Sequence, residues 1–280
     1  MSMAVESENV EAWSGKDRGD ENFPVGSQLI RRDLRAHVHA YYAFARNADD
    51  IADSPVLAPE DKIARLDHME AVLLGHAETG APSARALRDS LRVTDVAPRH
   101  ATDLLIAFRR DATKTRYADW AELYEYCRYS AMPVGRYVLD LHGEDAATHG
   151  PSDALCAALQ VLNHLQDCGK DVAALDRCYL PQDWMAAFGA TMADLAAPRC
   201  SAGLRTVLDA ALAETFALCV EAEALPRRVR ARGLRLETAI IVGLAHRLHR
   251  RLARRDPLAG RVKLMKTDIL GALLGALRHL

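Results

Sequence analysis

The amino-acid sequence predicts an all-α fold built as one large helical domain. Half of the 280 residues are hydrophobic, and most of these are Ala and Leu, which favour helices. Alternating runs of β-branched residues, the signal of half-buried strands, are scarce. The length allows one domain with a substantial core, although length alone would also permit two.

Hydrophobic periodicity and helix-breaking residues predict where the helices lie. Ser54-Pro55, Pro226 and Asp256-Pro257 should end helices, because proline cannot continue one. Residues 1–20 are expected to form a flexible N-terminal arm, and residues 21–280 the helical domain. Tyr179-Leu180-Pro181 should be extended. The expected helices span about 32–53, 59–75, 83–92, 98–110, 119–142, 152–175, a segment from about 182, 203–225, 232–254 and 263–277.

Several features of the sequence bear on where the protein resides. No uncharged apolar stretch reaches the roughly 18–20 residues that would span a bilayer. The first 22 residues are acidic and polar and lack the apolar core of a signal peptide. The six cysteines form no CxxC pair, which favours reduced, buried thiols. We therefore expect a cytoplasmic protein.

Positive charge is concentrated near the C-terminus. Residues 227–266 carry a net charge of +11, and the rest of the chain −13. Solvated helix faces, a nucleic-acid site or contact with an anionic membrane surface would each explain this segment. A nucleic-acid partner is disfavoured, because the segment lacks interleaved aromatic residues and any known nucleic-acid motif. Solvated faces and peripheral contact with the inner membrane stay open.

Two predicted helices each carry a stripe of polar residues. Arg46, Asp49, Asp50 and Asp53 stand at i, i+3, i+4 and i+7, which places them along one helix face. Aspartates at this spacing repel one another unless water or a cation neutralises them, so a solvated acidic face is the plainer interpretation.

A second polar stripe favours a binding site over a solvated acidic face. Gln160, Asn163, Asp167 and Asp171 share one face of an otherwise apolar helix, where polar side chains need partners. Two such helices facing each other would present carboxylate oxygens to a Mg²⁺ ion, which binds through a few carboxylates together with substrate phosphate oxygens. The pattern therefore predicts a magnesium and diphosphate site.

The segment between the two stripes offers further candidates. Arg116 could bind phosphate through its planar guanidinium. Ser130, Ala131 and Gly135 are small residues in an apparent helix. They would either leave room for a long lipid tail or allow two helices to pack closely.

These residues together resemble the squalene/phytoene synthase family. The likeness rests on the two DxxxD helices, on the segment Arg116-Tyr117 to Gly135, and on Arg177-Cys178-Tyr179-Leu180-Pro181. It covers about residues 22–185 by motif, and more weakly the C-terminal helices. It implies a helical isoprenoid synthase fold with a central apolar cavity, and an enzyme that uses Mg²⁺ on a prenyl diphosphate.

Within that family, the chain looks like the branch that forms hydroxysqualene in bacterial hopanoid biosynthesis. Residues 21–25, 43–53 and 163–167 carry this likeness. Gln166 stands where head-to-head synthases carry Arg, and Asp20-Glu21-Asn22 stands where they carry a phosphate-binding segment. Both differences remove groups that would bind a second diphosphate. The resemblance thus implies a carbon–oxygen lyase that ionises presqualene diphosphate and captures the cation with water, without NADPH.

The resemblance also implies a role for each candidate residue. The metal ligands would be Asp49, Asp50, Asp53, Asp167 and Asp171. The diphosphate would be bound by Arg46, Arg116, Lys170 and Arg177. Tyr42 and Tyr126 would face phosphate or the cation, and Asn163 and Gln166 would orient the diphosphate or the water. His164, next to Asn163, is expected to point away from the aspartates and to serve packing.

Two other functions stay open. A head-to-head prenyltransferase would join two prenyl diphosphates into presqualene diphosphate, squalene or phytoene. A helical scaffold of the same fold would be catalytically silent, although both aspartate motifs are intact here. The expected partners are a small prenyl diphosphate and, transiently, neighbouring pathway enzymes, with no nucleic acid.

Overall fold

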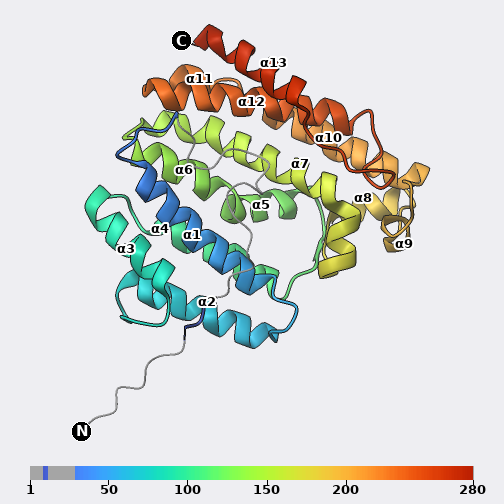
Figure 1. Cartoon of the computed structure of the whole chain (residues 1–280). Coiled ribbons are helices and arrows are strands. Elements are labelled where there is room, and N and C mark those ends of the chain that lie inside the picture. Colours follow the sequence, from blue (N-terminus) through green and yellow to red (C-terminus); the bar gives the residue numbers. More distant parts are fainter. Residues whose placement is uncertain (1–8, 12–28, 280) are drawn as a thin grey trace. The chain divides into compact units, whose positions relative to one another are not determined.

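The computed structural model describes residues 9–11 and 29–279, and within them it confirms the all-α prediction (Figure 1). Two short strands, β1 (Arg116–Tyr117) and β2 (Cys178–Pro181), form a parallel pair. The longer helices are α1 Arg35–Ala52, α2 Pro59–Leu74, α3 Pro82–Thr94, α4 Arg99–Asp111, α5 Trp120–Ser130, α6 Met132–Leu141, α7 His149–Leu175, α10 Ala202–Ala222, α12 Arg232–Leu252 and α13 Lys266–Ala276. The short helices are η1 Ala146–Thr148, α8 Gln182–Ala187, α9 Met192–Leu195, α11 Leu225–Arg228 and η2 Leu277–His279.

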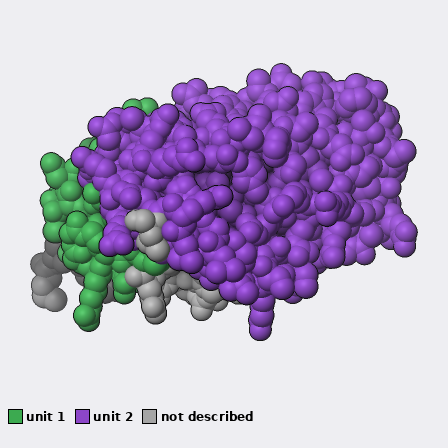
Figure 2. Space-filling view, turned by 90° about the horizontal axis from the view of Figure 1, so that it is seen from above, with its two compact units in different colours: residues 1–113, 140–142 green, residues 114–139, 143–280 purple. Residues whose placement is uncertain are grey.

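The chain divides into two compact units, coloured separately in Figure 2. Unit 1 comprises Met1–Thr113 and Asp140–His142, and unit 2 comprises Lys114–Leu139 and Gly143–Leu280. The sequence had predicted a single helical domain over residues 21–280, and that prediction remains open.

In unit 1, α1 packs against α2, α3 and α4. Phe44, Ala48 and Ile51 are completely buried on one face of α1, at the i, i+4 and i+7 spacing of an amphipathic helix. The described part of the predicted arm also belongs here. The Glu11 carboxylate accepts hydrogen bonds from the Ser83 N–H (2.7 Å) and hydroxyl (2.6 Å) at the start of α3. The rest of residues 1–20 lies outside the described residues.

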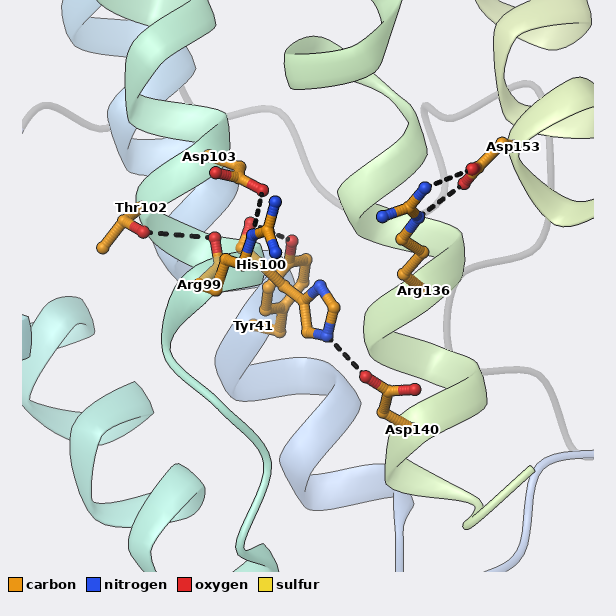
Figure 3. A network of polar contacts seen from close by, with 8 residues as sticks. All are labelled: Tyr41, Arg99, His100, Thr102, Asp103, Arg136, Asp140 and Asp153. Atoms are coloured by element: carbon orange, nitrogen blue, oxygen red, sulfur yellow. Dashed lines mark hydrogen bonds and ion pairs between the residues drawn. The ribbon is translucent and has the colours of Figure 1, made fainter. Parts of the chain in front are cut away.

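A polar chain links three parts of unit 1 (Figure 3). The Tyr41 hydroxyl of α1 donates to the His100 carbonyl at 2.9 Å, and His100 Nε2 lies 2.7 Å from Asp140 Oδ2. Within unit 2, drawn in the same figure, the Arg136 guanidinium binds the Asp153 carboxylate through both oxygens and so joins α6 to α7. Such bidentate pairs fix the geometry of the two elements that they join.

Unit 2 is organised around α7, the longest described helix of the chain, with 27 residues. It packs against α5, α10 and α12. Its C-terminus is capped by Asp176 in the left-handed region (φ 51°), and the chain then continues into β2. The Cys178 N–H donates to the Thr115 carbonyl, which brings β2 against β1. The predicted extended segment Tyr179–Pro181 is therefore confirmed.

Most predicted helices agree with the structure to within about three residues, but the single helix expected over 119–142 is wrong. The structure interrupts it at Ala131, whose φ and ψ of −128° and −48° are not helical. Pro133 lies two residues later. It lacks an N–H and restricts the residue before it, so the helix restarts there as α6.

Of the three small residues in this region, the structure tests the role of Gly135. A Cβ built on Gly135 would lie 2.4 Å from Ser152 Oγ and 2.6 Å from Cys156 Sγ. The glycine therefore lets α6 and α7 approach closely within unit 2, and at this position the close-packing interpretation is correct.

The six cysteines are free thiols, as predicted. Burial raises the pKa of Cys127, Cys156, Cys168, Cys200 and Cys219 to about 12, and it also raises that of Cys178. No described helix combines the length and apolarity needed to cross a membrane.

Candidate functional site

The aspartates of α1 surround an arginine in unit 1. Arg46 places its guanidinium 2.6 Å from Asp49 Oδ2 and 2.5 Å from Asp50 Oδ1. Asp50 is buried, whereas the Asp49 side chain remains 32% exposed. Asp53 caps the helix, with its N–H donating to the Asp49 carbonyl at 2.8 Å. Asp49 and Asp53 are therefore the carboxylates that a ligand from solvent could reach.

The negative charge around Asp49 exceeds what Arg46 neutralises. Burial raises the pKa of Asp49 to about 7, with further contributions from the charges of Asp53, Asp111 and Asp50 and an opposing one from Arg46. Asp111, buried at the end of α4, was missed by the sequence analysis. The sequence feature that could have identified Asp111 is its place on the apolar face of an amphipathic helix, at the end of that helix. A divalent cation would relieve this repulsion.

The second aspartate pair lies on α7 in unit 2. Asp167 and Asp171 are both partly exposed and one helical turn apart, and Asn163 is half-buried on the same stripe. Lys170 Nζ lies 4.0 Å from Asp167 Oδ1, and its side chain is 73% exposed. Lys170 is thus an exposed cation next to Asp167, able to reach an anionic ligand from solvent.

His164 lies differently from the sequence-based expectation. Its Nδ1 is 3.9 Å from Asp171 Oδ2, so the prediction that it points away from the aspartates is wrong. The ring also stacks on Tyr179, and its Nε2 lies 3.0 Å from the Gln160 amide nitrogen. The sequence correctly predicted that His164 lies on a helix. It could not predict the stacking on Tyr179, because Tyr179 belongs to β2 and helical spacing gives no information about contacts between elements.

Aromatic rings gather beside the aspartates of α7. Tyr117 lies 5.2 Å from Tyr126 and 5.5 Å from Tyr179, measured between ring centroids, and Tyr126 lies 5.7 Å from Tyr179. Together with His164, these residues bring β1, α5, β2 and α7 into one cluster, which we call the tyrosine cluster. Aromatic faces at such spacing can stabilise a cation. Tyr42, the other predicted tyrosine, is half-buried on α1 in unit 1.

The two predicted phosphate-binding arginines of unit 2 lie where the strands β1 and β2 begin. Arg116 donates through Nη2 to Asp176 Oδ1 at 2.7 Å and through Nη1 to the Asp176 carbonyl. Arg177 is buried immediately before β2. Arg116 therefore has a carboxylate partner, which a diphosphate would have to replace or share.

Gln166 contacts the segment that precedes α13. Its amide nitrogen donates to the Val262 carbonyl at 2.5 Å, which ties α7 to the chain that precedes α13. Its Oε1 is buried and has no hydrogen-bond partner within the described residues. A recess of about 440 Å³ opens beside Gln166, and Lys170 and Arg261 are among its lining residues.

The donor atoms fit a metal that relies on its substrate for ligands. Within the described residues, no three His, Cys, Asp or Glu side chains converge closely enough to form a metal centre by themselves. Mg²⁺ binds in proteins through one or two carboxylates, several waters and substrate phosphate oxygens. The excess negative charge at Asp49 suits such an ion.

These features describe an all-helical protein with an aspartate pair on each of two helices and with cationic and aromatic groups nearby. A family model described as squalene/phytoene synthase matches residues 16–268. The chain belongs to the squalene/phytoene synthase family. It is an enzyme that acts on a prenyl diphosphate, in a family that generally depends on a divalent metal.

Two relatives and one solved structure show which members of the family the chain resembles. The chain is 47% identical over 267 residues to a hydroxysqualene synthase of Rhodopseudomonas palustris, covering 95% of this chain and 91% of the relative. It is 44% identical over 260 residues to a hydroxysqualene synthase of Zymomonas mobilis, covering 92% and 87%. The crystal structure of squalene synthase HpnC from Alicyclobacillus acidocaldarius matches with a TM-score of 0.73 and 34% identity, covering 82% and 87%.

Proposed function

We propose that the protein is a hydroxysqualene synthase, which ionises presqualene diphosphate and captures the resulting cation with water. The observation that carries the proposal is the 44–47% identity to hydroxysqualene synthases along nearly the whole chain. The side chains present, namely carboxylates, phosphate-binding cations and a tyrosine cluster, are those that such a reaction needs.

The proposed cofactor is Mg²⁺, which would neutralise the diphosphate as it leaves. In unit 1 the proposed metal ligands are Asp49 and Asp53 of α1, and in unit 2 they are Asp167 and Asp171 of α7. Asp50 would have to release Arg46 to join them, because its carboxylate is buried on that guanidinium.

Four cationic side chains are proposed to contact the diphosphate. Arg46, Arg116, Lys170 and Arg177 would each donate charge-assisted hydrogen bonds to phosphate oxygens. Lys170 is the most readily available of these, because its side chain is largely exposed. Tyr42 would add a hydroxyl donor.

In the proposed reaction, the carbon–oxygen bond to the diphosphate breaks and the electron pair leaves with the diphosphate. Tyr126 and the other rings of the tyrosine cluster stabilise the carbocation through their faces. The oxygen of a water molecule then bonds to the cation, and its proton passes to the released diphosphate. Asn163 and Gln166 are proposed to orient the diphosphate or that water. This bond cleavage is the basis for proposing a carbon–oxygen lyase.

Product analysis tests the proposal. Purified protein with Mg²⁺ and presqualene diphosphate should release hydroxysqualene, identified by mass spectrometry, and should not require NADPH. Turnover of farnesyl diphosphate to a C30 product would instead assign a head-to-head prenyltransferase. Full activity of both Asp49→Ala and Asp167→Ala would refute the proposed metal ligands.

We also propose a cytoplasmic location at the surface of the inner membrane, with transient contact to neighbouring enzymes. The substrate and product are long hydrocarbons, so release at a membrane surface would avoid passage through water. The predicted central apolar cavity for the hydrocarbon remains part of this proposal.

A further inference from the structure

Helix α13 turns its large apolar residues towards solvent. Leu270 is 58% and Leu274 is 61% exposed, while the buried positions of the helix are the small residues Ala272 and Ala276. A helix on the surface of a globular domain normally has the opposite arrangement. We call the outward surface the α13 face. Its members are Met265, Ile269, Leu270, Leu273, Leu274 and Leu277.

Close packing against α12 fixes this orientation. A Cβ built on Gly243 of α12 would lie 3.4 Å from Ala272 Cβ, and one built on Gly271 would lie 2.8 Å from a nitrogen of the Arg247 guanidinium. The two helices therefore meet through glycine and alanine. Rotating α13 to bury its leucines would drive bulky side chains into these contacts. The exposed leucines follow from tight packing on the other side of the helix.

Arginines border the α13 face. Five arginines of the α12 end (Arg247, Arg250, Arg251, Arg254 and Arg255) line a recess of about 300 Å³, and Asp268 is the only acid in its lining. Arg251 binds Asp268 at 2.7 Å. Within the described residues, the exposed Arg250 and Arg254 form no ion pair with a carboxylate. The exposed Lys263 and Lys266 extend the positive charge along the start of α13.

From this juxtaposition we propose that the α13 face docks on an anionic lipid surface, with its leucines in the acyl boundary and the bordering arginines on phosphate headgroups. A contiguous apolar stripe beside unpaired cations is the pattern of interfacial helices. The face contains only aliphatic side chains and one methionine. The cores of protein interfaces are enriched in aromatic residues as well as in Met and Arg, and the face has no aromatic residue, so hydrocarbon is the better match. The inference rests on unit 2 alone and is independent of the reaction proposed above.

Vesicle sedimentation with the full chain tests the proposal. Wild-type protein should bind vesicles of phosphatidylcholine and phosphatidylglycerol at least ~10-fold more tightly than vesicles of phosphatidylcholine alone, and this preference should weaken in high salt. Leu270→Gln/Leu274→Gln should reduce binding at least ~10-fold. Arg250→Gln/Arg254→Gln should remove most of the preference for the anionic lipid. Val220→Gln, which changes a side chain that is 48% exposed on α10, is the matched control and should bind like wild type.

Four results would overturn the proposal, three of them from vesicle binding. The three vesicle results are no binding of the wild type to anionic vesicles, wild-type binding by the leucine double variant, and equal loss in the Val220→Gln control. A second copy of the chain on the α13 face would appear by light scattering as a wild-type dimer that the leucine variant converts to a monomer, and this would also overturn it. The leucines point outwards, so melting temperatures of the variants should match the wild type. Should the leucine variant fail to fold, the arginine variant still decides the outcome.

Discussion

The His164 ring lies flat against the ring of Tyr179, with centroids 3.5 Å apart and planes inclined by 14°. Burial lowers the pKa of His164, and the nearby Asp171 carboxylate opposes this shift only in part. The imidazole is therefore neutral at neutral pH. A neutral, stacked ring beside an aspartate pair is both a packing element and a polar contact, and substitutions can separate these roles.

Replacing His164 should distinguish packing from chemistry. His164→Ala removes a buried ring and should lower the free energy of unfolding by about 2–4 kcal/mol. His164→Phe keeps a flat ring on Tyr179 and should lose less stability. It also removes the polar contacts to Gln160 and Asp171. We expect His164→Phe to lower kcat roughly 10-fold with presqualene diphosphate, because the polar contacts position α7 groups. Wild-type kcat in this variant would assign His164 to packing alone.

The lowered pKa of His164 should also make the stability of the fold depend on pH. Its folded pKa lies below the ordinary value of 6.5, so the unfolded chain binds a proton more readily. The stability that the neutral ring provides is therefore present above about pH 6.5 and declines as the pH falls below it. Urea denaturation across this range should show a steeper loss for wild type than for His164→Phe. Parallel curves would contradict the prediction.

The ionisation of Asp49 should change the stability of the fold with pH in the opposite direction. Its pKa is raised to about 7, so the folded protein holds a proton that the unfolded chain releases near its usual pKa of 3.8. The destabilisation is absent below that value, grows as the pH rises towards 7 and is complete above it. Asp49→Asn should therefore raise the melting temperature at about pH 8 but not at about pH 4.

The effect of magnesium on the melting temperature tests whether Asp49 is a metal ligand. At about pH 8 the ion should raise the melting temperature of the wild type and not of Asp49→Asn, because ligand binding stabilises only the form that binds. Asp61→Asn, an exposed change on α2, is the control and should keep the magnesium response. An equal response in Asp49→Asn would remove Asp49 from the ligand set.

Gly135 should tolerate no side chain. The new methyl group of Gly135→Ala would overlap Ser152 Oγ and Cys156 Sγ and should destabilise unit 2 by about 1–3 kcal/mol. Gly150→Ala is the matched control, because a Cβ there meets nothing within 4 Å. It should be neutral or slightly stabilising, since Ala favours helices over Gly. Chemical denaturation of both variants measures the difference. Equal stabilities would show that α6 and α7 can separate without penalty.

The Gln166 tether gives a local prediction. Gln166→Ala removes the hydrogen bond to the Val262 carbonyl, which should weaken the attachment of residues 257–262 to α7 by about 1 kcal/mol. Hydrogen exchange in that segment should rise several-fold, while α10 stays unchanged. Protection equal to that of the wild type would show that other contacts hold the segment.

The sequence was most informative where the signals are local. Helix ends at prolines and glycines were predicted to within a few residues, because each depends on backbone chemistry at that position. The aspartate stripes were predicted from helical spacing alone. Their neighbours were not, because the stacking of His164 on Tyr179 and the charge of Asp111 on Asp49 join residues far apart in the chain. The break at Ala131 was missed although Pro133 signals it, because the flanking periodicity was read as continuous.

The raised pKa values of the native thiols have a practical consequence for labelling the protein. Five of the six cysteines have pKa values raised to about 12, so at about pH 7.5 almost none of their thiolate is present to react with a maleimide. A cysteine introduced at an exposed position such as Leu274 would ionise near its ordinary pKa and would be modified selectively. An environment-sensitive fluorophore could then be attached there without first removing the native cysteines.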